Sequence, residues 1–362
     1  MTRPSTISGF WRRDLRLLLR GLGLMVVVLS TGCASLQHTR ELTRRGWEGF
    51  AGPLQNPDAT APLGLTTDRG YEPGKIPVIM IHGLLSDAMT WNEPIRALRE
   101  DEAINSRYQF WTYRYLTGET YLKTAADFRA ELIMTLEGLD PQRQDPLLHQ
   151  VVLVGHSMGG LIAKLQVAAS GDDLWQTITA VPLDQTTLAP ADREQLAGMF
   201  YFAPQIRVQQ AVFIATPHRG SEWTQRPLAR LGRRFIEFPQ EMKEEYDRWL
   251  VENQAILKHA PAKIPTSIDH LDPDNPILLA TARLPVAPQV KLHSIIGQGH
   301  RLPDGSPGDG VVSIASAQIP GVASELFVEG SHSGLHHQPE TIAQLKRILL
   351  QDDSQAPDAT QD

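Results

Sequence analysis

The sequence predicts an α/β fold in which a mostly parallel sheet carries helices on both faces. Short runs of β-forming residues alternate with amphipathic helical segments from residue 76 to about residue 350, which is the order typical of such sheets. One run, residues 151–154, contains only Val and Leu without polar alternation. We expect a strand of this kind at the centre of the sheet, where helices cover both of its faces.

The individual elements follow in chain order. Six segments rich in aliphatic and aromatic residues are predicted strands: 76–81, 108–115, 151–154, 211–214, 290–296 and 325–328. Two amphipathic segments are predicted helices: 121–139 and about 339–350. Residues 33–75 are polar and are expected to form a tether with a short helix near 40–50. Residues 351–362 are expected to be a disordered tail.

Two stretches, about 171–209 and 221–286, are too long to be ordinary connections between these elements. We expect both to be helical insertions that cap the functional site. The segment 240–258 in the second stretch has apolar residues at helical spacing, a pattern that packing against the core explains more simply than a substrate gate.

Composition limits the classes of function. The chain has 362 residues, of which 41% are hydrophobic and 21% charged, enough for one large core. Its formal net charge is -7, and no basic stripe with interleaved aromatic residues occurs in the body of the chain. We therefore expect no nucleic-acid partner.

The N-terminus contains the single cysteine of the chain. Four arginines between residues 12 and 20 precede the short apolar run 21–29, and Ser30, Thr31 and Gly32 lead to Cys33. This arrangement resembles a bacterial lipoprotein signal peptide, which implies cleavage before Cys33, its acylation, and lipid anchoring of residues 33–362 in the cell envelope. Ala34 favours the outer membrane if the host is Gram-negative. The alternative is an uncleaved transmembrane anchor with an incidental cysteine.

A Gly-x-Ser-x-Gly motif, Gly155 to Gly159, lies between the strand 151–154 and a helical segment. In such a strand-to-helix turn the central Ser157 is in a strained conformation, and the flanking glycines avoid a collision. The motif nominates Ser157 as a catalytic nucleophile. The alternative is an ordinary glycine-rich turn with an incidental serine.

A nucleophilic serine needs a base and an acid that orients the base, and both are expected later in the chain. Asp309 is our candidate acid, with Asp304 in the same loop as the alternative. His332 is the candidate base because it follows the strand 325–328 and precedes the last helix; His336 and His337 are its rivals. His332 and His336 are four residues apart, but Gly334 and the lack of a nearby third ligand argue against a metal site, and no cofactor is expected.

Two backbone N–H groups are expected to stabilise the oxyanion. Met158 follows the nucleophile and supplies one of them. Leu84, in the loop that follows the strand 76–81, is the candidate for the other, with His82 holding that loop. The loop 216–221 is a further candidate for lining the site.

Five segments together, 81–91, 151–163, 213–221, 309–312 and 332–350, resemble bacterial α/β-hydrolases of the lipase and esterase type. The resemblance covers about residues 76–350. It implies the α/β-hydrolase fold, a Ser157, Asp309 and His332 triad, and hydrolysis of acyl esters, lipid esters among them, through an acyl-enzyme. An acyltransferase, a thioesterase, an amidase, or a binding lipoprotein without catalysis stays open as an alternative.

Overall fold

The computed structural model describes residues 62–225 and 265–351, with seven isolated positions between them (244, 247, 248, 250, 251, 257 and 258). The predicted signal peptide, Cys33, the short helix near 40–50 and the tail beyond residue 351 lie outside the described residues. So does most of the predicted helix 240–258. Within the described part of the chain, no helix is both long and apolar enough to cross a bilayer.

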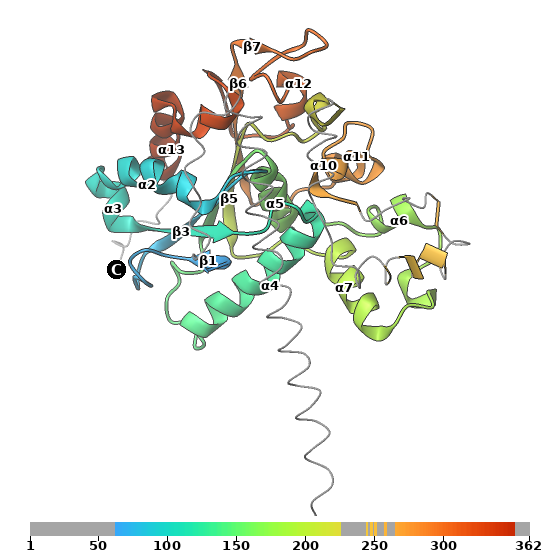
Figure 1. Cartoon of the computed structure of the whole chain (residues 1–362). Helices are drawn as coiled ribbons and strands as arrows, with labels where there is room; N and C mark the ends of the chain where they lie inside the picture. The colour runs from blue at the N-terminus through green and yellow to red at the C-terminus, as the bar shows by residue number, and fades with distance from the viewer. Residues whose placement is uncertain are drawn as a thin grey trace, which may run out of the picture.

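The described residues contain a seven-stranded sheet with the strand order β1-β3-β2-β4-β5-β6-β9 (Figure 1). All neighbouring strands are parallel except the edge pair of β1 and β3, which is antiparallel. The strands are β1 Gly64–Thr66, β2 Ile76–Ile81, β3 Tyr108–Arg114, β4 Val151–His156, β5 Val208–Ile214, β6 Lys291–Gln298 and β9 Ser324–Glu329. This arrangement confirms the predicted fold class.

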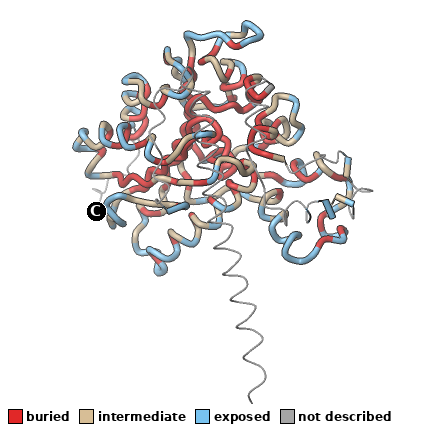
Figure 2. The backbone as a smooth tube through the Cα atoms, viewed as in Figure 1, coloured by how far each residue is buried: buried red, intermediate tan, exposed pale blue. Residues whose placement is uncertain are grey.

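Helices cover both faces of the sheet. One face packs against α4 (Tyr121–Leu139) and α5 (Met158–Val167). The other packs against α2 (Asn92–Arg99), α3 (Glu102–Arg107) and α13 (Pro339–Gln351). Strands β2 and β4 are therefore buried along their whole length (Figure 2), which explains why their sequences lack polar alternation.

Short elements connect this framework. They are η1 Ala88–Trp91, α6 Trp175–Ile178, η2 Leu183–Gln185, α7 Pro190–Phe200, η3 Glu222–Gln225, α10 Ser267–His270, α11 Pro276–Arg283, α12 Ile314–Ala317, η4 His332–His337 and the hairpin of β7 His300–Arg301 with β8 Pro307–Gly308. The sequence pattern does not indicate β1 or this hairpin, because strands of two or three residues are too short to show a periodic pattern.

The two insertions start at opposite edges of the parallel strands but meet beside α6, where the Lys258 N–H donates to the Ile178 carbonyl at 2.8 Å and Thr179 forms a β-bridge with Leu257. The first, 171–209, contains α6 and α7 and is joined to the last turn of α5, where the N–H of Gln205 donates to the carbonyl of Gln166 at 2.7 Å. Its described residues flank the end of α5 that is far from Ser157. The first insertion links the end of α5 to the start of β5, and both lie at the amino edge of the parallel strands. That either insertion caps the site stays a prediction.

The second insertion leaves the carboxyl end of β5, on the side of Ser157. Its described ends include Trp223 and Ile268, which pack together with Leu84 and Val311. Leu84 belongs to the loop after β2, and Val311 to the loop that contains Asp309. The described ends of this insertion therefore lie against two loops of the candidate site.

Candidate active site

Ser157 occupies the turn between β4 and α5. Its backbone has φ 54° and ψ -124°, a conformation that non-glycine residues rarely adopt. The turn is held on both sides, since the Ser157 N–H donates to the Ile214 carbonyl at 2.8 Å and its own carbonyl accepts from the Gly160 N–H at 2.9 Å. The side chain is thus fixed at the carboxyl end of the central strand, within a site where Ser157 is only 6% exposed.

Three glycines make this turn sterically feasible. A Cβ at Gly155 would lie 2.5 Å from the backbone nitrogen of Gly160, and one at Gly159 would lie 2.5 Å from the carbonyl oxygen of His82. A Cβ at Gly160 would collide with the side chain of Thr216. Gly155 and Gly159 are therefore required by backbone contacts that cannot move aside, and Gly160 lets α5 pack closely against the chain after β5.

His332 lies beside Ser157, at the start of η4. Its Nε2 is 2.9 Å from Ser157 Oγ, and its Nδ1 is 2.7 Å from Asp309 Oδ2. A carboxylate only accepts hydrogen bonds, so Nδ1 carries the proton and Nε2 is free to accept from the serine hydroxyl. The structure brings the three predicted residues together in the order that nucleophilic catalysis by serine requires.

Asp309 is held by more than the histidine. Its Oδ1 accepts the N–H groups of Val311 at 2.9 Å and Val312 at 2.8 Å, and its Cβ packs on β6 at Gly297. Burial of this 3% exposed residue favours the neutral acid, but the His332 imidazole and the two N–H donors outweigh burial and lower the pKa of Asp309 below its usual value. Asp309 is therefore an ionised carboxylate at neutral pH.

The alternative acid, Asp304, does not contact the site. It lies in the exposed turn between β7 and β8, where its Oδ1 accepts from the Ser306 N–H at 2.9 Å and from the Ser306 hydroxyl at 2.7 Å. These local bonds are typical of an aspartate that stabilises a turn.

The rival bases are also engaged elsewhere. His336 Nε2 is 2.5 Å from Thr90 Oγ1, and His337 Nε2 is 3.3 Å from the same oxygen. His337 Nδ1 also lies 3.4 Å from Glu93 Oε2. Both rings thus face η1 and α2, and His332 is the histidine of this loop that reaches Ser157.

His156 is a part of the site that the sequence pattern does not indicate. Its Nε2 donates to the backbone carbonyl of His332 at 2.9 Å, and its ring centroid lies 5.1 Å from that of His332 and 4.4 Å from that of His336. Complete burial, together with the nearby His332, lowers the pKa of His156 to about 3, so the ring is neutral. Its sequence signal was weak, because any residue can precede the serine in the motif.

The loop after β2 lies against the nucleophile. A Cβ at Gly83 would be 2.9 Å from the Cβ of Ser157, so the backbone of Gly83 closely approaches the serine, and Leu84 follows directly in the same turn. His82 stabilises the loop, because its ring stacks on Tyr115 at 4.2 Å and its Nε2 accepts the Tyr115 N–H at 3.3 Å. Burial lowers the pKa of His82 to about 4.

Met158, the second expected oxyanion donor, is the first residue of α5. The N–H of a first helical residue has no carbonyl partner within its own helix. Leu84 and Met158 therefore both belong to turns that adjoin Ser157.

The loop 216–221 is hydrogen-bonded to the segment that follows Asp309. Ser221 Oγ donates to the carbonyl of Val311 at 2.5 Å, and Ser316 Oγ donates to the carbonyl of Gly220 at 2.6 Å. These bonds tie the chain after β5 to the loop that contains Asp309. Among residues 62–225, 265–351 and the isolated positions between them, no group of three His, Cys, Asp or Glu side chains could hold a metal ion.

A model of the alpha/beta hydrolase family matches residues 78–345. The chain belongs to this family. The match confirms the predicted α/β-hydrolase fold and spans every element that contributes Ser157, Asp309 and His332. In this alpha/beta hydrolase the serine turn lies between β4 and α5, the acid loop after β6, and the histidine after β9. No curated protein matches the chain.

Several solved structures are similar to this alpha/beta hydrolase at low identity. The mature form of the lipase BlEst2 from Bacillus licheniformis is 15% identical, with 82% of this chain and 96% of that chain covered and a TM-score of 0.45. The phospholipase PlaB from Legionella pneumophila is 16% identical, with 76% and 59% covered and a TM-score of 0.45. EstA from Clostridium botulinum is 12% identical, with 83% and 91% covered and a TM-score of 0.45.

Proposed function

We propose that this protein is a serine hydrolase that cleaves carboxylic esters through an acyl-enzyme, with Ser157 as nucleophile, His332 as base and Asp309 as the orienting acid. One observation carries the proposal. Hydrogen bonds of 2.9 Å and 2.7 Å connect Ser157 Oγ, both nitrogens of His332 and the buried Asp309 carboxylate. These contacts support the roles that we assign to the three residues.

The geometry supports a specific sequence of proton transfers. Ser157 Oγ attacks the ester carbonyl while His332 Nε2 takes its proton, and Asp309 stabilises the imidazolium that forms. The N–H groups of Met158 and Leu84 are assigned to the oxyanion. His332 then protonates the departing alcohol oxygen, which leaves the acyl group on Ser157. A water molecule, deprotonated by His332, releases the acyl group as a carboxylic acid and restores the serine.

We also propose that Cys33 carries lipid and anchors the protein in the cell envelope, in the outer membrane if the host is Gram-negative. The basic, apolar and small-residue segments that precede Cys33 support this location. An enzyme held at a membrane meets acyl lipids directly, so lipid esters are the substrates that we expect. Metabolic labelling with an alkynyl fatty acid tests the anchor, since Cys33→Ser should abolish incorporation.

The catalytic proposal is tested by turnover of chromogenic esters from acetate to palmitate by the full chain. Ser157→Ala should lower kcat by roughly 10⁴-fold or more, as in other enzymes with this triad. Ser106→Ala, which changes an exposed serine of α3, is the matched control and should have no effect.

Two further experiments distinguish a hydrolase from a binding protein and from an acyltransferase. An alkyl phosphonate should label the wild-type protein at Ser157 and fail to label Ser157→Ala, whereas a protein that only binds esters would not be labelled. Assays with added glycerol show whether the acyl group passes to an alcohol instead of water. Retention of most activity by Ser157→Ala would contradict the proposed nucleophile.

A further inference from the structure

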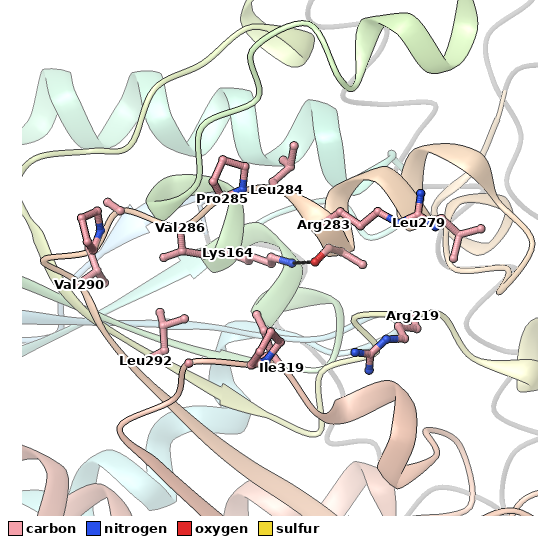
Figure 3. Close-up of a pocket in the computed structure, with 15 residues that line it drawn as sticks. Lys164, Arg219, Leu279, Arg283, Leu284, Pro285, Val286, Val290, Leu292 and Ile319 are labelled. Carbon is pink, nitrogen blue, oxygen red and sulfur yellow. Dashed lines mark hydrogen bonds between the residues drawn. The ribbon is translucent and has the colours of Figure 1, made fainter.

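A cavity lies on the face of the sheet that carries α5. This half-open cavity of about 670 Å³ is lined by α5, the end of α11, the start of β6 and the loop after α12 (Figure 3). None of Ser157, Met158, Asp309 and His332 lines it. Its residue from α5 is Lys164, which is seven residues, or about 10 Å, along the helix from Ser157. The cavity is thus separate from the candidate active site.

Lys164 is the central polar group of this cavity. The residue is 1% exposed, and its Nζ donates to the carbonyl of Ala282 at 2.9 Å (Figure 3). An ammonium group has three N–H donors, and none of the described residues lining the cavity is acidic. Burial, together with the charge of Arg219, lowers the pKa of Lys164 to about 7, as expected for an ammonium group without an anionic partner.

Two arginines add to the positive charge. Arg219 is held by hydrogen bonds from its Nη1 to the carbonyls of Ala315 and Gln318, which orient its guanidinium beside the cavity. Arg283 contributes from the last turn of α11. A guanidinium carries five donors in a planar fork that matches a carboxylate. The charged part of the lining is therefore complementary to an anion.

The remaining wall is apolar. It is formed mainly by aliphatic side chains and prolines, among them Leu284, Val286, Val290, Leu292 and Ile319 (Figure 3). An inorganic anion would leave this surface without a partner, whereas a molecule with an acidic head and an aliphatic chain would contact both parts. The volume is within the range of small-molecule sites.

We propose that this cavity binds an aliphatic carboxylate, whose head group contacts Lys164 and Arg219 and whose chain lies along the apolar wall. The site does not depend on the reaction proposed for Ser157, because it shares none of the residues assigned to catalysis. If the protein does hydrolyse acyl esters, its own acid product belongs to the class of molecule that the cavity would bind.

The test uses the full chain with Ser157 blocked by an alkyl phosphonate, so that the candidate active site is occupied. The probe is decanoic acid with a photoreactive diazirine in its chain, and decan-1-ol with the same diazirine is the neutral counterpart. Cross-linked peptides are identified by mass spectrometry. We expect saturable labelling by the acid within residues 279–292 or 319–321, competed by decanoate but not by decanol.

Two variants test whether labelling depends on the charges of Lys164 and Arg283. Lys164→Met removes the ammonium but keeps a long apolar side chain, and should weaken labelling roughly tenfold or more, the effect of losing a charge-assisted hydrogen bond. Arg283→Gln tests the cavity rim without altering a buried residue, and should weaken labelling about two- to fivefold, as expected for a more exposed charge. Lys346→Met on α13 is the matched control and should not affect labelling.

Thermal unfolding of each variant shows whether it folds. If Lys164→Met does not fold, Arg283→Gln still tests the proposal. Equal labelling by acid and alcohol, or labelling unchanged in both cavity variants, would overturn the proposal. Failure of the proposed catalysis would show separately, as a lack of phosphonate labelling at Ser157. In that case the probe is used without the block, and cross-linked peptides still identify the site.

Discussion

Helix α5 buries a polar side chain near each end, and the two surroundings differ. At its start Ser157 is hydrogen-bonded to His332, which is hydrogen-bonded to Asp309, whose second oxygen accepts two backbone N–H groups. Two turns later Lys164 has one carbonyl partner and no described acidic neighbour in its cavity. The polar groups around Ser157 have hydrogen-bond partners within the protein. Lys164 has no anionic partner there, so an external anion can pair with its positive charge.

The largest expected effect concerns the Ser157 end of α5 and the charge of Asp309. Asp309→Asn keeps the shape of the acid but removes its charge, so the imidazole loses the group that fixes its tautomer. We expect kcat for a chromogenic ester to fall by roughly 10³- to 10⁴-fold. Asp304→Asn is the matched control, because Asp304 bonds with Ser306 in its own turn and with Glu222 and contacts none of Ser157, His332 and Asp309, and it should retain activity within about twofold. A comparable loss in both variants would contradict the assignment of the acid.

A second change tests the turn itself. In Gly159→Ala the new methyl group would meet the backbone oxygen of His82, which cannot move without displacing the loop after β2. We expect the free energy of unfolding to fall by about 2–4 kcal/mol, measured by urea denaturation. Gly198→Ala in α7 is the control, since nothing lies within 4 Å of that site. Equal stability of the two variants would argue against close packing at the serine turn.

His156 offers a test of how His332 is positioned. His156→Phe fills the space but removes the N–H that donates to the His332 carbonyl, and should lower kcat about 10- to 100-fold with little change in KM. His156→Gln retains an N–H donor and should recover part of this loss. If both variants lose activity equally, the ring packing of His156 matters and its hydrogen bond does not.

The smallest effect concerns Lys164 and depends on pH. Its pKa is about 7 in the folded protein and 10.5 as its ordinary value, so the unfolded chain binds more protons between these values, and stability rises with pH across this window. Burial favours the neutral amine most, and the charge of Arg219 adds to it. Arg283 also lines the cavity, and the nearby His218 is neutral because burial and the charges of Lys164 and Arg219 lower its pKa.

Lys164→Met removes this contribution. Urea denaturation at pH 7 and pH 9 should therefore show a larger rise in stability for the wild type than for Lys164→Met, by about 1–3 kcal/mol. The comparison of the two proteins cancels the other groups that titrate in this range. Equal rises would mean that Lys164 keeps its ordinary pKa, and that the two ends of α5 differ less than the geometry indicates.

Local sequence was sufficient for the framework. The unbroken aliphatic runs of β2 and β4 reflect burial on both faces, and the helix predicted at 121–139 coincides with α4. The spacing of Gly155, Ser157 and Gly159 predicted the serine turn, because its constraint acts between neighbours in the chain. Such patterns arise from contacts within a few residues and can be read without the fold.

Long-range packing decided the rest. Asp304 and Asp309 look equivalent in sequence, as do His332, His336 and His337. Only the fold shows that His332 contacts both Ser157 and Asp309. About 150 residues or more separate Asp309 and His332 from Ser157 along the chain. Lys164 reads as an ordinary helical lysine, yet α11 and β6 bury it. The sequence by itself determined the class of fold and nominated the serine. The tertiary structure decided which side chains share an environment, because hydrogen bonding and burial depend on distances in space.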